Sequence, residues 1–459
     1  MFGWFRDYWR IVIPPKSLAE IDAERWLLVC PLPGGERSCQ CRSFFRYYIL
    51  IAAITAQFVC GVLFALSTVS KPFDLNVFGG HNQDRNTALG ILSGVCVALT
   101  AAFVGPASER NGPRWSTLLG AGFVALGLLS VQLALWTLTW SPLILGCVSL
   151  GLGFGYLMVS SISTPRADAA APGTERAYYE HVRGLTLVQC IFSTDFVCLV
   201  LAFAANTTMA LLYVEIATPS VDGLLTSWYD VSLADANAFI LHADVVGLAG
   251  RFCCPILSDV LLRVLYLNPA YARKLVMLLL LLVPAVALPL LHSQLDDFGQ
   301  LKTLIFIVKV CSGGGFAVIG CFLTDLYGVY NMGTMYGLIL MSWSIGMVVV
   351  RLVFSGLKSD FVDQVRLMWV LSIAGFVFMA LVRTDNMDRF YLGYQYSVCG
   401  KIVIQRPYKK TASVRQSVAS IARSTPTPVG GIAPPEDTRT RHDEPFFLVS
   451  SDSETSYVV

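Results

Sequence analysis

Residues 104–120 read VGPASERNGPRWSTLLG and separate two apolar runs, residues 87–104 and 115–138. Each run is long enough to cross a bilayer, which takes about 20 residues of α-helix. A connection this short, this charged and this rich in glycine and proline must turn tightly at a membrane face. Gly105 and Gly112 permit close approach and unusual backbone angles. The stretch therefore predicts two membrane-spanning helices joined by a tight turn.

The same turn carries charged residues that predict a conformational latch. Glu109, Arg110 and Arg114 supply one acid and two bases within six positions. A carboxylate near a helix N-terminus is stabilised by the helix dipole and by a nearby guanidinium. Pro106 and Pro113 are expected to close one helix and to open the next. We therefore expect an ion pair that forms in one conformation and is strained in another. The alternative is an ordinary cytosolic loop, which would also be basic and turn-rich.

The turn resembles the motif G-x-x-x-D-R-x-G-x-R, which lies between helices 2 and 3 of major facilitator superfamily transporters. The matching residues are Gly105, Glu109, Arg110, Gly112 and Arg114, with Glu in place of the usual Asp. Pro113 gives the G-P-R variant found in nodulin-like and monocarboxylate-type members. The resemblance implies an all-α membrane protein with two helical halves around a central cavity, and secondary transport by alternating access.

Composition also predicts a multi-pass membrane protein. Hydrophobic residues make up 55% of the chain and charged residues 14%. The net charge of +2 gives no electrostatic footprint for nucleic acid. The 13 cysteines show no metal-binding spacing, and no catalytic arrangement of side chains is evident. We therefore expect neither an enzyme nor a resident cofactor or metal.

Ten apolar runs are expected to span the membrane in a four-plus-six arrangement. A bundle over residues 47–163 and another over residues 185–383 are joined by a cytosolic linker, residues 164–184. The expected spans are residues 47–69, 87–104, 115–138, 142–163, 185–218, 236–257, 275–291, 303–323, 335–357 and 367–382.

The excess of Lys and Arg places both termini in the cytosol, at the plasma membrane or an organelle membrane. Residues 1–46 form the cytosolic N-terminal segment, and residues 384–459 form a mostly disordered tail. Arg263, Arg273 and Lys274 are expected in cytosolic loops.

The run at residues 185–218 is unusual because it has 34 residues. We expect one long or broken helix, with Asn206-Thr207-Thr208 as its weak point; two short spans are the alternative. These three residues also form a glycosylation sequon, which would be inaccessible within a span. Gly313-Gly314-Gly315 in a later span is expected to be a packing notch or hinge.

The second half carries a weaker copy of the latch. Gly250-Arg251, Pro255 and Ser258-Asp259 resemble the segment G-R-x-x-x-G-x-x-S-D of the nodulin-like branch, without an arginine directly after the Asp. The resemblance covers residues 47–383 and leaves the family's fifth and sixth helices without a counterpart. The chain is then a reduced transporter, a homodimer, a membrane receptor or scaffold that has lost transport, or the product of an incomplete gene model.

Charged residues within the second-half spans are the candidate substrate and ion-coupling site. They are Glu215, Asp244, Lys309 and Arg351, joined by Arg251, which resembles an arginine of the eighth helix of monocarboxylate-type members. Each charge costs about 3 kcal/mol at the bilayer centre, so each needs water or a partner. Our hypothesis is that Arg351 and Lys309 attract a small organic anion while Asp244 carries a coupling proton. Static ion pairs or snorkelling side chains are the alternative.

Overall fold

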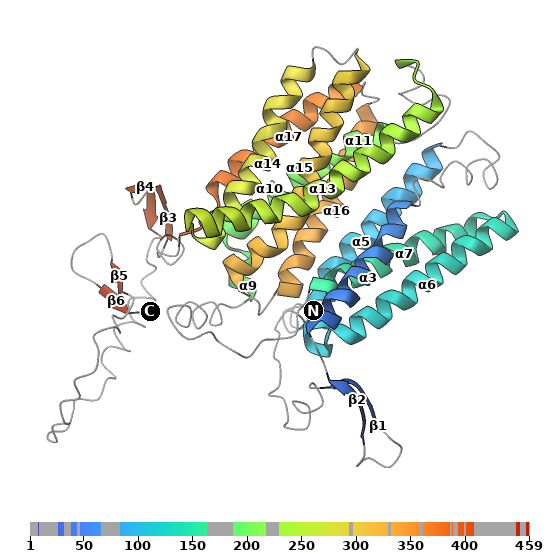
Figure 1. Ribbon diagram of the computed structural model, residues 1–459, viewed down its shortest axis with the longest axis horizontal. Helices are drawn as coiled ribbons and strands as arrows, with labels where there is room; N and C mark the ends of the chain where they lie inside the picture. The colour runs from blue at the N-terminus through green and yellow to red at the C-terminus, as the bar shows by residue number, and fades with distance from the viewer. Residues whose placement is uncertain are drawn as a thin grey trace. The chain divides into compact units, whose positions relative to one another are not determined.

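Long helices occupy the apolar runs of the sequence (Figure 1). The side chains of some terminal helix residues, including Glu215, lie outside the described part. The computed structural model describes residues 8, 26–31, 38–43, 46–65, 83–162, 187–216, 229–292, 297–328, 332–357, 361–385, 388, 393–398, 401–407, 447–449 and 456–458.

The N-terminal half is a bundle of four helices built on small residues. They are α3 (Arg46–Ala65), α5 (Gln83–Asn111), α6 (Pro113–Thr137) and α7 (Trp140–Ile162). A Cβ on Gly127 of α6 would lie 2.6 Å from Leu150 of α7, and one on Gly151 of α7 would lie 2.7 Å from the Ser93 carbonyl of α5. Such close backbone approach is how helices gain packing energy in lipid.

The C-terminal half contains six spans, the first of them broken. Its helices are α9 (Leu187–Ile191), α10 (Thr194–Thr208), α11 (Ala210–Ile216), α13 (Leu233–Leu265), α14 (Pro269–His292), α15 (Phe298–Tyr327), α16 (Met332–Leu357) and α17 (Phe361–Leu381). The expected broken helix at residues 185–218 is confirmed. Its breaks lie at residues 192–193 and at Met209, immediately after Asn206-Thr207-Thr208.

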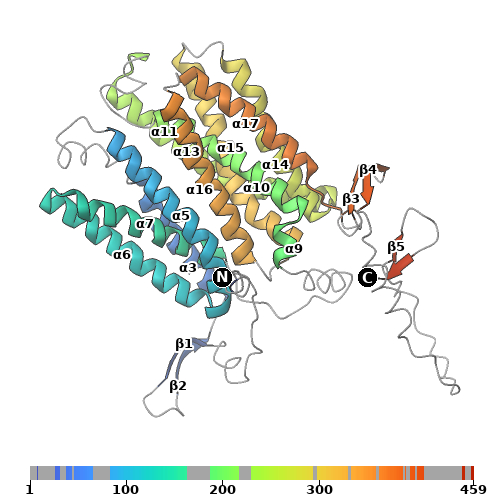
Figure 2. The ribbon, with the colours of Figure 1, turned by 180° about the vertical axis from the view of Figure 1, so that it is seen from behind.

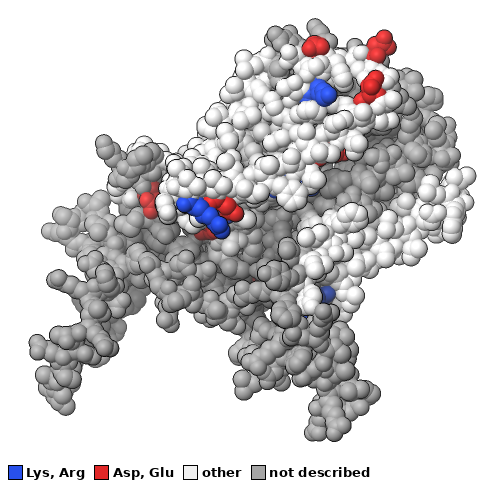
Figure 3. All heavy atoms as spheres, in the orientation of Figure 1, with Lys and Arg blue, Asp and Glu red and all other residues white. Residues whose placement is uncertain are grey.

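The helices are those of a multi-pass membrane protein. Within the described chain, nine spans are long and apolar enough to cross a membrane, and α3 adds a shorter described apolar stretch, Ile51–Cys60. Charged side chains on the visible face gather near two ends of the bundle, and the described surface between them is mostly uncharged (Figure 3). The predicted all-α, four-plus-six architecture is therefore confirmed.

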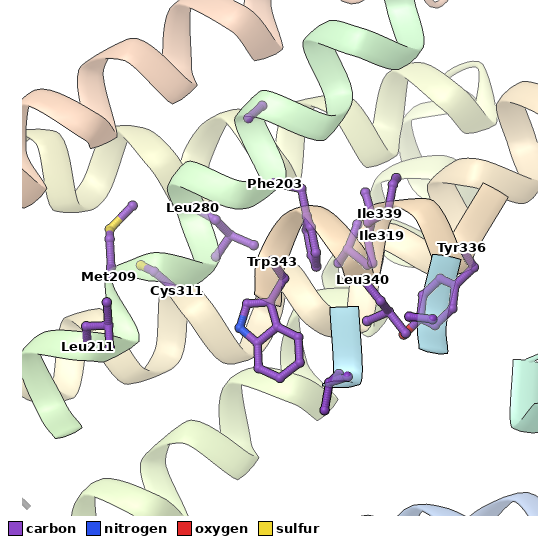
Figure 4. Close-up of a cluster of buried hydrophobic side chains, with 14 of the residues drawn as sticks. Phe203, Met209, Leu211, Leu280, Cys311, Ile319, Tyr336, Ile339, Leu340 and Trp343 are labelled. Carbon is purple, nitrogen blue, oxygen red and sulfur yellow. The ribbon is translucent and has the colours of Figure 1, made fainter. Parts of the chain in front are cut away.

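Aromatic rings connect the two halves in the core. The ring of Phe316 in α15 meets those of Phe203 in α10 and Trp343 in α16 edge to face, with centroids 5.3 and 5.2 Å apart. Figure 4 shows Phe203 and Trp343 among the buried apolar side chains around them. Trp343 also lies 6.1 Å from Phe154 of α7 in the N-terminal half. Edge-to-face pairs of this kind stabilise a core beyond the area that they bury.

The three consecutive glycines of α15 form the notch that the sequence predicts. A Cβ on Gly313 would lie 2.6 Å from the Gly247 carbonyl of α13, and one on Gly314 would lie 2.5 Å from the sulfur of Cys254. A Cβ on Gly315 would lie 1.9 Å from Oδ1 of Asn206, which is fully buried. Glycine is thus required for α15 to approach both α13 and α10.

Two helix boundaries differ from the prediction. Pro106 lies inside α5, which continues to Asn111, so that Gly112 alone connects α5 to α6 with φ of 84°. A proline within a helix removes one backbone hydrogen bond, and contacts of the last turn, described below, hold the helix beyond it. Arg273 and Lys274 lie in α14 instead of a loop. The Lys274 Nζ donates to the Ala380 and Val382 carbonyls, at 2.8 and 2.6 Å, and so caps the C-terminal end of α17.

Short strands appear where the sequence predicted irregular chain. In the N-terminal segment β1 (Trp26–Pro31) pairs antiparallel with β2 (Ser38–Ser43). A separate compact unit, Arg383–Val459, contains the antiparallel pair β3 (Gly393–Val398) and β4 (Lys401–Pro407), and the pair β5 (Phe447–Val449) and β6 (Ser456–Val458). Alternation of Tyr394 and Tyr396 with polar residues is the period-two pattern that favours β3. The expected linker at residues 164–184 lies outside the described residues.

Gly315→Ala is expected to destabilise the protein by about 1–3 kcal/mol, because the new methyl group would overlap the buried Asn206 amide. The matched control on the same helix is Gly320→Ala, whose Cβ would meet nothing nearer than the flexible end of Met332 at 4.0 Å. It should be neutral or stabilising, since alanine favours a helix over glycine by roughly 1 kcal/mol. Thermal unfolding of the purified variants in detergent measures both. Equal melting temperatures for Gly315→Ala and Gly320→Ala would contradict the close packing of Gly315 against Asn206.

Candidate functional site

The two halves are joined along an antiparallel contact between α5 and α16, which lie side by side in both ribbon views (Figures 1 and 2). A Cβ on Gly94 would meet Val348 at 3.3 Å, and the Ser344 hydroxyl donates to the Gly94 carbonyl. About two turns further along, a Cβ on Gly337 would lie 2.1 Å from the Ala101 carbonyl. We call this contact the α5–α16 seam. Its glycines bring the backbones of the two halves together.

The predicted latch residues lie at one end of the seam, which we call the latch end. The Glu109 Oε1 accepts a hydrogen bond of 2.9 Å from the Thr334 backbone N–H. Thr334 is in the first turn of α16, where backbone N–H groups lack helical partners and the helix dipole is positive. Gly105 makes the approach possible, because a Cβ there would lie 2.4 Å from the Thr334 Cα. Glu109 therefore caps a helix of the other half.

The other latch residues hold the turn within the N-terminal half. The Arg110 guanidinium donates to the backbone carbonyl of Tyr8 and lies 5.2 Å from the centroid of its ring. The Tyr8 hydroxyl donates to the Phe103 carbonyl, and burial raises the pKa of Tyr8, so the phenol stays protonated as a donor. Arg114 is exposed near the start of α6. Sequence reasoning predicted an arginine partner for Glu109 and missed the helix N-terminus that its carboxylate contacts.

The second-half copy of the latch is completed by an arginine from another helix. Asp259 of α13 accepts from the Arg273 Nη1 of α14 at 2.6 Å, and the Arg273 Nε lies 3.4 Å from Asp325 of α15. Arg273 also donates to the hydroxyl of Ser258. The arginine missing directly after Asp259 is thus supplied 14 positions later. Only the three-dimensional contact identifies this arginine, because the sequence does not show which residue of α14 lies beside Asp259.

Two of the predicted intramembrane charges form an ion pair between α13 and α15. The Lys309 Nζ lies 2.8 Å from the Asp244 Oδ1 and 3.7 Å from the centroid of the Tyr213 ring in α11. The Asp244 side chain is 56% exposed, whereas that of Lys309 is 18% exposed. The carboxylate is therefore the member of the pair that a proton or a solute reaches first. Sequence reasoning missed Tyr213, whose ring face attracts the ammonium group.

The remaining predicted charges lie on different helices. Arg251 is exposed on α13, and its Cγ lies 3.4 Å from the position of a Cβ on Gly313. Its charge acts electrostatically on Lys309 and on Tyr336 of α16. Arg351 reaches the seam at the end opposite the latch, with Nη1 3.7 Å from a Cβ placed on Gly90. The structure thus brings Asp244 and Lys309 together and leaves Arg351 on another helix pair.

The described residues contain no group of three or more His, Cys, Asp or Glu side chains that could hold a metal ion. A small cavity between α14 and α17 is lined by Leu288, Pro289, Val365, Arg366 and Trp369, none of which belongs to the predicted site. The candidate site consists of charged side chains on membrane-spanning helices. Such groups bind ions and protons and exchange ion-pair partners.

The fold resembles known transporters, although no protein-family model and no curated protein matches the chain. A crystal structure of a bacterial homologue of the iron transporter ferroportin, in the outward-facing state, aligns with a TM-score of 0.51 and 12% identity, covering 72% of this chain and 98% of that one. A second crystal structure of a bacterial homologue, with soaked iron, aligns with a TM-score of 0.49 and 14% identity, covering 73% and 98%. The likeness to the first supports the major facilitator fold expected from the latch motif.

Glu109→Gln is expected to speed hydrogen exchange in the first turn of α16 by roughly 2- to 30-fold, because a neutral amide loses about 0.3–2 kcal/mol of charge–dipole stabilisation. Hydrogen–deuterium exchange measured by mass spectrometry, on the peptide that contains the Thr334 N–H, reports this directly. Arg114→Gln is the control, since Arg114 is exposed on the same turn. Unchanged protection in Glu109→Gln would show that the carboxylate does not hold the latch.

Proposed function

We propose that this chain is a secondary active transporter that moves a small solute by alternating access, in the nodulin-like or monocarboxylate-type branch of the major facilitator superfamily. The observation that carries the proposal is the hydrogen bond from the Thr334 N–H to Glu109, because it joins the two halves at one end. A carboxylate at a helix N-terminus can be made and released without disrupting an apolar core. Such a contact suits a protein that opens and closes at this end.

The energy of the latch suits a gate that opens reversibly. A carboxylate at a helix N-terminus contributes about 0.3–2 kcal/mol, which is small enough for solute binding to overcome. Gly105 holds the end of the seam in close contact, so release of Glu109 frees α16 to separate there. In this proposal the structure is closed at the latch end, which is the cytosolic end if the charge distribution sets the topology.

The proposed substrate is a small organic anion, coupled to protons. Asp244 and Lys309 form an ion pair whose carboxylate is the more exposed member. Protonation of Asp244 removes its negative charge, and the Lys309 ammonium is then left to attract an anion. Arg351 lies on the seam, where a change in its surroundings accompanies any separation of α5 from α16. Binding of a proton and an anion is in this way linked to movement of the halves.

A non-transporting membrane receptor or scaffold is the second candidate function. The observation that favours it is the exposure of α13, which packs on α14 and α15 and has no extended contact with the first four helices in the described chain. A transporter with the full complement of helices would cover this face with its own fifth helix. A homodimer or a longer gene product would restore such a cover.

Asp244→Asn is expected to reduce solute accumulation driven by a proton gradient at least about tenfold. Exchange of solute at equilibrium should be retained. A permanently neutral side chain cannot take up the coupling proton. Uptake of a panel of radiolabelled small organic acids and neutral solutes into vesicles containing the purified protein provides the measurement. Lys309→Gln should lose both activities, because the anion loses its partner.

Lys302→Gln is the matched control for Lys309→Gln, because Lys302 lies on the same helix but is exposed. Its uptake should stay within about twofold of wild type. Absence of uptake of every solute by folded wild-type protein would favour the scaffold. Gradient-driven accumulation that survives in Asp244→Asn would contradict proton coupling through this residue.

A further inference from the structure

The hairpin of β3 and β4, in the C-terminal unit, has two faces of different polarity. Side chains alternate between the faces of a strand, so Tyr396 and its cross-strand partner Ile404 share one face, and Gln395 and Gln405 share the other. The Gln395 Nε2 donates to the Asp388 Oδ1 at 3.1 Å, and the Gln405 Nε2 donates to the Gln395 Oε1 at 3.5 Å. The glutamine face is therefore engaged in hydrogen bonds within this unit.

Three consecutive apolar residues of β4 are left at the surface. Ile402, Val403 and Ile404 are 55%, 62% and 40% exposed, and the register shift between Tyr396 and Ser397 leaves Val403 without a cross-strand partner. Within the described residues this sheet has only its two strands. A two-stranded hairpin is marginally stable in water, and a run of exposed apolar residues on it indicates a further surface that covers them.

Positive charge is concentrated around this hairpin in the sequence. Residues 389–435 contain seven Lys and Arg and no Asp or Glu, and Lys401 and Arg406 lie in β4 itself. The rest of the chain has 26 Lys and Arg, which is the total of 33 less these seven, against 31 Asp and Glu, a formal charge of −5. The positive net charge of the chain thus arises from this one segment, which indicates a partner of negative charge.

The hairpin is also tied closely to the membrane. The last span, α17, ends at Leu381, and β3 begins at Gly393. The connection over residues 382–392 extends at most about 40 Å even when it is straight. Within it the Arg383 Nη1 donates to the Asp388 carbonyl at 2.9 Å, so the connection folds back on itself and reaches less far. The hairpin therefore remains close to the lipid headgroups, whose effective concentration is high there.

From these observations we infer that the β3–β4 hairpin and the basic residues that follow it bind the anionic lipid headgroups of the membrane that holds the bundle. The exposed apolar residues of β4 enter the interface between headgroups and acyl chains, and the Lys and Arg side chains contact lipid phosphates and carboxylates. If the charge distribution sets the topology, this is the cytosolic face, whose leaflet carries the anionic lipids. The inference is independent of what the bundle transports.

A lipid surface fits these features better than a soluble polyanion does. Nucleic acid or an acidic peptide would pair with the basic residues and leave the apolar run of β4 in water. An anionic bilayer accepts both, because apolar side chains partition into its interface while its headgroups attract positive charge. Each Lys or Arg near such a surface strengthens binding about fivefold, so several together hold a tethered segment firmly.

Hydrogen–deuterium exchange of the full-length protein in lipid nanodiscs tests the inference. One set of nanodiscs contains phosphatidylcholine alone, and the other contains phosphatidylcholine mixed with phosphatidylserine. Exchange in peptides that cover residues 393–407 is expected to be at least about fivefold slower with phosphatidylserine. High salt should reverse the difference, because it screens the charges. Equal exchange of α17 in the two lipids confirms that the bundle itself is unchanged.

The double variant Lys401→Gln with Arg406→Gln should reduce the slowing by phosphatidylserine to less than about twofold, because two charges next to the apolar run are lost. The matched control is Arg439→Gln with Arg441→Gln. It removes two charges from a later part of the same tail, residues 436–444, in which Asp and Glu are also present. The control should be slowed as much as wild type.

Three results would overturn the inference. The first is equal exchange of the hairpin in both kinds of nanodisc. The second is equal slowing in the two double variants, because the hairpin charges would then have no special role. The third is slowing in phosphatidylcholine nanodiscs by an RNA oligonucleotide, a polyglutamate peptide or inorganic phosphate as strong as that by phosphatidylserine, which would indicate a soluble anion as the partner.

Discussion

Glu109 and the first turn of α16 form the contact on which the arrangement of the two halves depends. Elsewhere along the seam, glycines and small side chains bring α5 and α16 together through dispersion forces, which are weak individually, and through the hydrogen bond from Ser344 to the Gly94 carbonyl. The hydrogen bond from the Thr334 N–H is different, because its acceptor is a carboxylate at a helix N-terminus. It also depends on Gly105, since any larger residue there would push the two backbones apart and lengthen the hydrogen bond.

The aromatic cluster and the latch contact different parts of α16. Trp343 contacts rings from α15 and from α7, so the middle of α16 is held by both halves. At the latch end the same helix also contacts the Glu109 carboxylate and the backbone of Gly105. This gradation, with apolar surface in the centre and a polar cap at one end, is what a gate requires if it is to open at that end without disrupting the core.

Hydropathy and local motifs predicted the membrane spans, because a span is determined by residues that are close together in the sequence. The weak point after Asn206-Thr207-Thr208 and the glycine notch at residues 313–315 were both visible as local anomalies. The partners of the predicted site residues were harder to predict. Thr334, Arg273 and Tyr213 come close to them only through tertiary contact. The position of Pro106 inside α5 was missed for a related reason, since contacts beyond the proline outweigh its local preference. The functional roles of Asp244, Arg251, Lys309 and Arg351 remain predictions.

The presence of one seam also limits how the halves can move. A bundle whose halves meet along two symmetry-related seams can only rock about an axis between them. In the described part of this chain α5 meets α16 along its length, whereas α13 has no extended contact with the first four helices. If the chain works by the proposed alternating access, the contacts favour rotation of one half about the seam itself. Such rotation widens the side next to α13 along the full thickness of the membrane, so that access from the lipid and access from water change together.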